Sequence, residues 1–154
     1  MHSLSIPGSK GLPTSWLNRT SLAARNSERN ERWLQELLFE HSDLIPIREI
    51  NPGISGFVPL CRELTIPKAG GSVYLDIFGV TPEGKLVLIE CKLWPNPEAR
   101  REVIGQILEY ASLVRKWTYG DLSARVRAVT KSEAINPIYQ AVAQHYPDLD
   151  EGES

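Results

Sequence analysis

The chain has 154 residues, which is the length of one domain with a sizeable hydrophobic core. Charged residues make up 23% and hydrophobic residues 42% of it, as in ordinary globular proteins, and no apolar run is long enough for a membrane span. The start of the chain lacks the basic and then apolar pattern of a secretory signal, and Cys61 and Cys91 lie in apolar runs without the spacing of a zinc site. We therefore expect a cytoplasmic protein with reduced thiols and no membrane partner.

The charge is unevenly distributed. The net charge is −2, but residues 1–131 carry all 17 Lys and Arg residues and only 14 of the 19 acids, a net of +3. A weakly basic body permits binding to DNA.

Three regions follow from composition. Residues 1–26 form an N-terminal arm: 1–14 are rich in Ser, Gly and Pro and are expected to pack loosely, and 15–26 are predicted as a short helix. Residues 27–146 are predicted as the folded domain, and residues 147–154 as an acidic tail.

The domain is predicted to begin with a helix over Glu28–His41, capped by Ser27. Its buried stripe comprises Trp33, Leu34, Leu37 and Leu38. Glu31 flanks this stripe, and Gln35 lies one turn further along the same edge. Residues 45–56 contain two prolines and two glycines and are predicted as a loop.

Strands are predicted next, over Val58–Ile66, Val73–Thr81 and Lys85–Leu93. The last two are joined by Thr81-Pro82-Glu83-Gly84, a sequence typical of a three-residue hairpin loop. If Thr81 faces Lys85, Asp76 lies directly across from Glu90.

This register places two acids about 4.5–5.5 Å apart at their Cβ atoms, an arrangement that is destabilising without compensation. Lys92 lies on the same face, beside the apolar Phe78 and Leu88. A divalent cation between Asp76 and Glu90 relieves the repulsion, so we predict a metal site. The competing interpretation is a solvated hairpin with ordinary surface charges, but the strand is unusually apolar for that. Arg62 and Glu63, on the preceding strand, either approach the site or form an exposed charge pair, and the charge pair is favoured.

A helix is predicted over Pro97–Lys116, capped by Asn96. Its sheet-facing residues are expected to be Val103, Ile104, Ile107, Leu108, Ala111 and Val114. Gln106 and Tyr110 share one edge of this face, where they serve the site or simply pack. Arg100 and Arg101, in the first turn, form a phosphate-binding corner or are solvated.

The alternating run Arg125–Thr130 is predicted as a fourth strand. Asn136-Pro137 then starts a last helix that reaches about His145.

Asp76 followed by Glu90-Cys91-Lys92 on a hairpin resembles the signature of the PD-(D/E)XK nuclease superfamily, although Leu75 stands where that family usually has Pro. The run ECKLWPNPEARREVIGQILEYA resembles a bacterial branch of it, and Gln106-x-x-x-Tyr110 is similar to the motif of RecB-like members. The resemblance implies an α/β protein with the restriction-endonuclease-like αβββαβ core, in which helices flank a mixed central sheet.

By this resemblance the chain is a DNA-cleaving enzyme with Mg²⁺ or Mn²⁺ as cofactor. The implied metal ligands are Asp76, Glu90, Glu31 and the backbone carbonyl of Cys91. Lys92 and Gln106 complete the implied catalytic set, and the implied nucleic-acid contacts are Arg100, Arg101 and Tyr110.

The resemblance implies a role in DNA repair, defence or mobile-element processing. A homodimer and a further C-terminal region are both compatible with it. A non-catalytic nucleic-acid-binding or assembly module on the same fold stays open, as does a plain protein-interaction domain.

Overall fold

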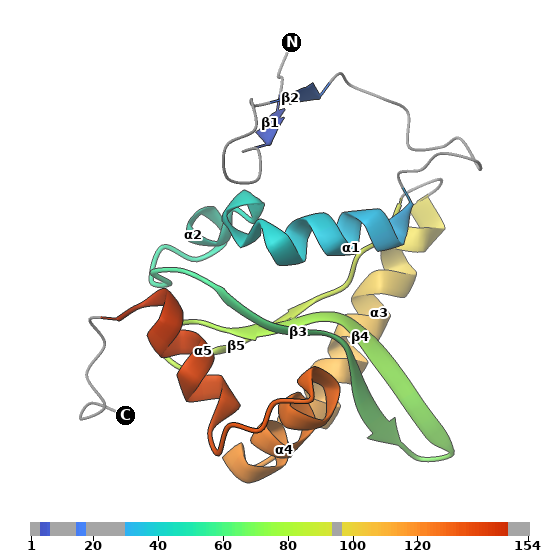
Figure 1. Ribbon diagram of the computed structural model, residues 1–154. Helices are drawn as coiled ribbons and strands as arrows, with labels where there is room; N and C mark the ends of the chain where they lie inside the picture. Colours follow the sequence, from blue (N-terminus) through green and yellow to red (C-terminus); the bar gives the residue numbers. More distant parts are fainter. Residues whose placement is uncertain (1–3, 7–14, 18–29, 94–96, 148–154) are drawn as a thin grey trace.

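The protein is an α/β protein built on a three-stranded antiparallel sheet (Figure 1). The structure, a computed structural model, describes residues 4–6, 15–17, 30–93 and 97–147. The sheet has the order β3 (Val58–Lys68), β4 (Gly71–Val80) and β5 (Leu86–Ile89). The helices are α1 (Glu31–Glu40), the single turn α2 (Ile47–Ile50), α3 (Pro97–Val114), α4 (Tyr119–Thr130) and α5 (Pro137–His145), and a 3-10 turn η1 covers Ser42–Leu44. None of the described helices is long and apolar enough to cross a membrane.

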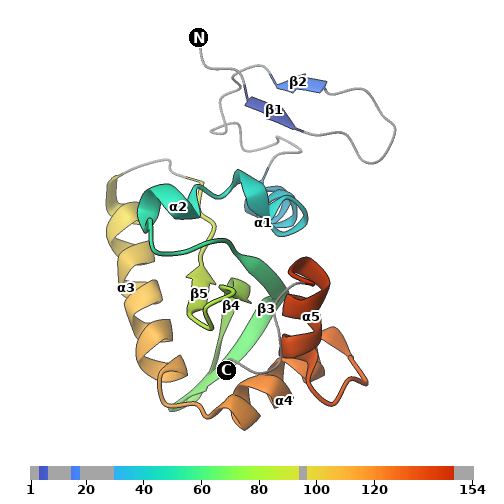
Figure 2. The same ribbon diagram turned by 90° about the vertical axis from the view of Figure 1, so that its left-hand side faces the viewer.

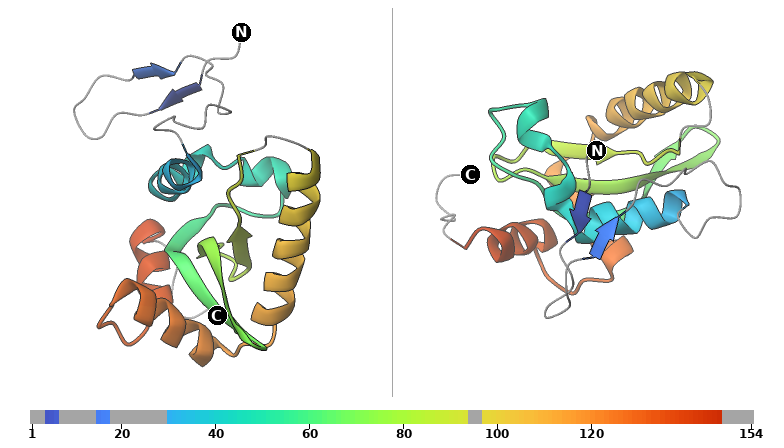
Figure 3. Two further views of the ribbon diagram at one scale, coloured as in Figure 1. Left: turned by 90° about the vertical axis from the view of Figure 1, so that its right-hand side faces the viewer. Right: turned by 90° about the horizontal axis from the view of Figure 1, so that it is seen from above.

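Helices cover the sheet from several sides. Figure 2 shows α3 on one side of the sheet and α5 on the other, with α1 above the strands and α4 below, and the left view of Figure 3 shows the same arrangement from the opposite side. Two groups of buried residues hold these layers together. The larger contains Phe78, Val114 and Val126, which join β4, α3 and α4, and the smaller contains Phe57, Ile77 and Cys91, against which α1 packs.

The register of the β4–β5 hairpin is confirmed. Thr81 N donates to Lys85 O at 2.9 Å, and Gly84 N donates to Thr81 O at 2.9 Å. Gly84 takes a φ of 77°, a left-handed conformation that glycine adopts without steric cost. Ile77 pairs with Ile89 and Phe78 with Leu88, so the same register carried one pair further places Glu90 opposite Asp76. The pairing ends at Ile89, earlier than the predicted Leu93.

The β3–β4 pair adds a feature that local patterns did not reveal. A register shift between Pro59 and Cys61 displaces the rest of β3 by one residue. Beyond it Arg62 pairs with Ile77 and Leu64 with Leu75, which places Glu63 opposite Asp76.

The predicted fourth strand is wrong, since Arg125–Thr130 is the second half of α4. Thr118 caps this helix in a reciprocal capping box with Asp121, and Leu122 and Val126, four residues apart, are both buried. The helical spacing of the apolar residues therefore prevails over the short alternation that suggested a strand. The described sheet is accordingly antiparallel and not mixed.

The N-terminal predictions also need correction. Helix α1 begins at Glu31, because Asn30 caps it by accepting a hydrogen bond from Trp33 N at 2.9 Å; the predicted cap, Ser27, lies outside the described residues. Ser15–Leu17 is not helical but forms strand β2, which pairs with β1 (Leu4–Ile6). The loop predicted over 45–56 contains the helical turn α2.

Helix α3 starts at Pro97 as predicted and ends at Val114, two residues before the predicted Lys116, and the face that it buries differs from the prediction. Tyr110 and Val114 are buried, whereas Ile104 and Leu108 are 54% and 65% exposed. The apolar residues of α3 span more of its circumference than the sheet covers, so one edge stays exposed. The predicted cap, Asn96, lies outside the described residues. The start of α5 is confirmed, with Asn136 Oδ1 accepting from Tyr139 N at 3.0 Å.

Two glycines provide a matched test of this packing. A Cβ added at Gly79 would overlap the Phe57 ring and the Val58 carbonyl oxygen, whereas one added at Gly105 meets nothing within 4 Å. We expect Gly79→Ala to lower the free energy of unfolding by about 1–3 kcal/mol. Gly105→Ala, in the interior of α3, should raise it by about 0.5–1 kcal/mol. Urea unfolding followed by circular dichroism measures both, and equal effects would contradict the tight β3–β4 packing.

Candidate functional site

Acidic residues from β3, from β4 and from the residue that follows β5 lie in one row across the sheet. Asp76 on β4 is opposed by Glu63 on β3 and by Glu90, which directly follows β5. Glu31, the first residue of α1, approaches the same place through its contacts with Leu93 and Lys92. The row therefore brings together chain segments about 60 residues apart.

Both oxygens of the Asp76 carboxylate are held in place. Oδ2 accepts a hydrogen bond from the backbone N–H of Cys91 at 2.6 Å. Oδ1 accepts one from Gln35 Nε2 at 3.2 Å, and the same nitrogen donates to the Asp76 carbonyl oxygen at 3.0 Å. The Asp76 side chain is thus fixed between α1 and the segment that follows β5.

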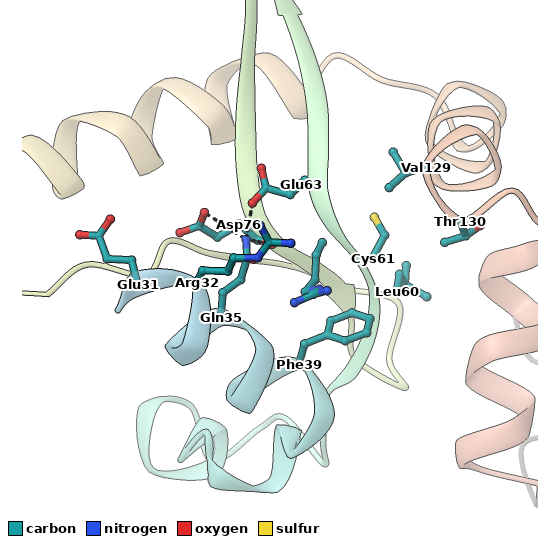
Figure 4. Close-up of a pocket in the computed structure, with 11 residues that line it drawn as sticks. Glu31, Arg32, Gln35, Phe39, Leu60, Cys61, Glu63, Asp76, Val129 and Thr130 are labelled. Carbon is teal, nitrogen blue, oxygen red and sulfur yellow. Dashed lines mark hydrogen bonds between the residues drawn. The ribbon is translucent and has the colours of Figure 1, made fainter. Parts of the chain in front are cut away.

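Gln35 also holds Glu63. Its Nε2 lies 2.7 Å from Glu63 Oε1, and Figure 4 shows the amide reaching from α1 toward both acids. Glu63 itself adopts a φ of 53°, a left-handed conformation that costs a residue with a Cβ about 1–2 kcal/mol. Such strain persists only where neighbouring contacts support it.

Glu31 and Lys92 form the outer edge of the group. Glu31 Oε1 accepts from Leu93 N at 3.2 Å, and Lys92 Nζ lies 3.6 Å from Glu31 Oε2. The Lys92 side chain is 28% exposed, so its charge stays near the acids while it retains access to water. The residue of α1 that touches Asp76 is Gln35 and not Glu31.

The negative charge of these acids is only partly compensated by their neighbours. Burial, and next the negative charge of Asp76, raise the pKa of Glu90 from 4.5 to about 7, although Lys92 acts against this. Burial, together with Glu63 and Glu31, likewise raises the pKa of Asp76, despite the hydrogen bond from Cys91. Glu90 Oε2 is buried and has no hydrogen-bond partner among the described residues. A buried carboxylate oxygen in this state is suited to a cation.

The Cys91 side chain has no place in this chemistry. It is 4% exposed and belongs to the core beneath α1, and burial raises the pKa of its thiol to about 12. A neutral buried thiol is a poor nucleophile. Its backbone carbonyl stays a predicted ligand.

Helix α3 lies behind Glu90. Burial and the charge of Glu90 both raise the pKa of Tyr110, whose ring is 4% exposed and packs in the core. Of the two roles weighed for Tyr110, this burial favours packing behind the site. Gln106 Oε1 is buried without a hydrogen-bond partner in the described part of the chain. Arg101 is exposed, and the side chain of Arg100 lies outside what the structure describes.

An open cleft of about 710 Å³ gives access to the β3 end of the row. In Figure 4 Glu31, Gln35, Glu63 and Asp76 line one side of it, and Val129 and Thr130 of α4 line the other. Two arginines also line the cleft. Arg62 lies 3.2 Å from Glu36 and 5.8 Å from the Phe39 ring centre, and Arg32 lies 3.6 Å from Glu36.

Sequence reasoning gave no site role to Gln35 and favoured a charge pair with Arg62 for Glu63. That pair is wrong, because Arg62 pairs with Glu36 and Glu63 accepts from Gln35. The only feature of the sequence that points to Gln35 is its position one turn after Glu31 on the same edge of the helix. Glu63 faces Asp76 because of the register shift at Pro59–Cys61, a consequence of tertiary pairing that the β3 sequence alone does not specify.

Over the described residues, no group of three or more His, Cys, Asp or Glu side chains is arranged to hold a metal ion. Searches of protein-family models, curated proteins and solved structures found no significant match to this chain.

The Glu90 carboxyl predicts a pH-dependent stability in metal-free protein. Because the folded state binds this proton more tightly than the unfolded chain, the free energy of unfolding should be highest below pH 4.5 and fall as the pH rises to about 7. We expect a fall on the order of 1–3 kcal/mol, removed largely by Glu90→Gln. Urea unfolding in EDTA between pH 4 and 8 measures it. Glu133→Gln, on an exposed residue, is the control; the same profile for wild type and Glu90→Gln would contradict the assigned cause.

Proposed function

We propose that the protein is a divalent-metal-dependent nuclease that hydrolyses DNA phosphodiester bonds. The observation that carries the proposal is the pair Asp76 and Glu90, opposed across the hairpin, with a buried Glu90 oxygen that has no hydrogen-bond partner in the described chain. A cation between two opposed carboxylates relieves their repulsion.

The donor set fits Mg²⁺ or Mn²⁺. Asp76 and Glu90 would hold the ion, with Glu31 and the Cys91 carbonyl as the further ligands that the family resemblance implies. Mg²⁺ is commonly bound by one or two carboxylates, with waters and substrate phosphate completing its shell. The absence of a group of three ligating side chains among the described residues is therefore compatible with Mg²⁺. When bound, such an ion activates water and polarises the phosphate.

The protein's own groups would serve the reaction by charge and by position. Lys92 keeps an ammonium beside the acids and partly exposed to water, where it can stabilise charge that develops on the phosphate. Gln106 would orient water or phosphate from α3, and Tyr110 would pack behind it.

A DNA strand would reach the acids through the cleft. Arg32 and Arg62 line it, and the Arg32 side chain is 81% exposed. Arginines beside an acidic site position the phosphate backbone without reading its sequence. Arg101, at the exposed start of α3, stays a further candidate for phosphate contact.

The finer fold assignment is also part of this proposal. The order α1, β3, β4, β5, α3 follows the first five elements of the αβββαβ nuclease core. The last element of that core is not supplied by residues 125–130, which are helical.

A second function is a non-catalytic nucleic-acid-binding module. The lack of a compact three-ligand metal group among the described residues favours it. It predicts binding to DNA without cleavage.

Cleavage decides between the two. We expect the full chain with Mg²⁺ or Mn²⁺ to cut at least one of single-stranded, duplex or branched oligonucleotides on denaturing gels. Lys92→Ala should lower the rate on the order of 100-fold or more, because it removes a charge from the transition state. Lys85→Ala, on the exposed turn of the same hairpin, should retain activity. No cleavage of any substrate by wild type would favour the binding module.

Binding tests the cleft independently of cleavage. In EDTA, Arg32→Ala combined with Arg62→Ala should weaken binding of a fluorescent oligonucleotide and lower its salt slope by about one per lost phosphate contact. Arg115→Ala, on an exposed residue just after α3, should bind as wild type does. Fluorescence anisotropy between 50 and 200 mM salt measures this, and unchanged binding by the double variant would contradict a strand in the cleft.

A further inference from the structure

Gln35 is an unusual residue for the place that it occupies. It is the only buried residue of α1, with 4% of its surface exposed, although the helix carries an apolar stripe beside it. Burying an amide costs free energy unless its polar atoms are hydrogen-bonded. In this case Nε2 is bonded to Glu63 Oε1 at 2.7 Å, to Asp76 O at 3.0 Å and to Asp76 Oδ1 at 3.2 Å.

The amide joins three elements through one nitrogen. It links α1 to β3 through Glu63 and to β4 through Asp76 (Figure 4). Without the Gln35 amide, the carboxylates of Glu63 and Asp76 would face each other with no hydrogen-bond donor from α1 between them. Cys91 N–H holds the other oxygen of Asp76, so removal of the Gln35 donor would leave that carboxylate fixed at one oxygen only.

The chemistry of an amide suits this position. A lysine there would donate as well, but its charge would neutralise the acids and compete with a cation. A glutamate would add a third negative charge and no donor. Glutamine donates without neutralising, so it fixes the carboxylates and leaves their negative charge available.

We propose that Gln35 is a positioning residue for metal binding, which orients the proposed ligand Asp76 toward the cation and holds Glu63 beside it. The inference rests on the proposed function, since it concerns the same acids. Residues that hydrogen-bond to metal-ligating carboxylates typically account for 10–100-fold in metal affinity. Gln35 donates such a hydrogen bond to Asp76.

The test is Mn²⁺ binding by the full chain, measured by electron paramagnetic resonance of the free ion. Gln35→Met keeps the approximate side-chain volume and removes the donor, and Gln140→Met on the exposed face of α5 is the matched control. We expect Gln35→Met to weaken Mn²⁺ binding at least about 10-fold, with an unchanged far-ultraviolet circular dichroism spectrum and with Gln140→Met as wild type. The weakened affinity at unchanged fold is the readout that a purely structural role would not move.

A second variant guards against loss of folding. Gln35→Asn keeps an amide but shortens it by one methylene, so its nitrogen cannot reach both acids; it too should bind Mn²⁺ more weakly. Gln35 variants that bind within twofold of wild type would overturn the positioning role and leave the nuclease proposal standing. Absence of Mn²⁺ binding by wild type, both alone and with an oligonucleotide present, would overturn both.

Discussion

The structure of the site depends on the repulsion between Asp76 and Glu90. A three-residue loop, closed by the hydrogen bonds between Thr81, Gly84 and Lys85, fixes the pairing of β4 with β5 and with it the approach of these acids. Like charges opposed in a half-buried position are destabilising. After burial, the charge of Asp76 raises the pKa of Glu90, and the charges of Glu63 and Glu31 raise the pKa of Asp76. The surrounding contacts are the compensation that the protein itself supplies. Cys91 N–H and Gln35 donate to Asp76, while Lys92 brings the positive charge.

The placement of α1 follows from the same constraint. Its apolar side packs through Leu34 and Leu38 on the core that contains Ile77 and Cys91, and this packing presents Gln35 to the acids. Glu31, one turn earlier, then meets the segment after β5, where it pairs with Lys92 and the backbone of Leu93. Helix α1 thus contacts the acidic row at two places. Gln35 donates a hydrogen bond to Asp76, and Glu31 pairs with Lys92 beside Glu90. The hydrophobic contact and the polar contact reinforce each other.

The sequence was sufficient wherever local chemistry decides the structure. The turn residues of the β4–β5 hairpin, the alternation around Asp76 and the cap of α5 are local signals. The register that sets Asp76 opposite Glu90 follows from the first two. Glu63 was assigned to a charge pair with Arg62 because its position opposite Asp76 results from a register shift that depends on the partner strand. The run 125–130 was assigned to a strand because Val126 between two arginines alternates over a few residues. Residues 125–130 are helical because Thr118 caps the helix upstream and because Leu122 and Val126 are buried in the core. Thr118 and Leu122 lie outside the six residues that suggested a strand.

The incomplete compensation of this acidic row bears on how the proposed site would work. Gln35, Cys91 N–H and Lys92 fix the acids but leave Glu90 Oε2 buried and unpartnered within the described chain. A site with two principal carboxylates would hold Mg²⁺ weakly by itself, because the ion requires six oxygens and keeps waters in the remaining positions. Substrate phosphate would supply further oxygens from the cleft, and linkage then requires that DNA and cation each raise the affinity of the other. Two acids in place of three are therefore compatible with a nuclease whose metal is recruited together with its substrate. In the alternative binding module the arginines of the cleft would engage DNA with no such mutual dependence, so that cation and strand would bind as independent ligands.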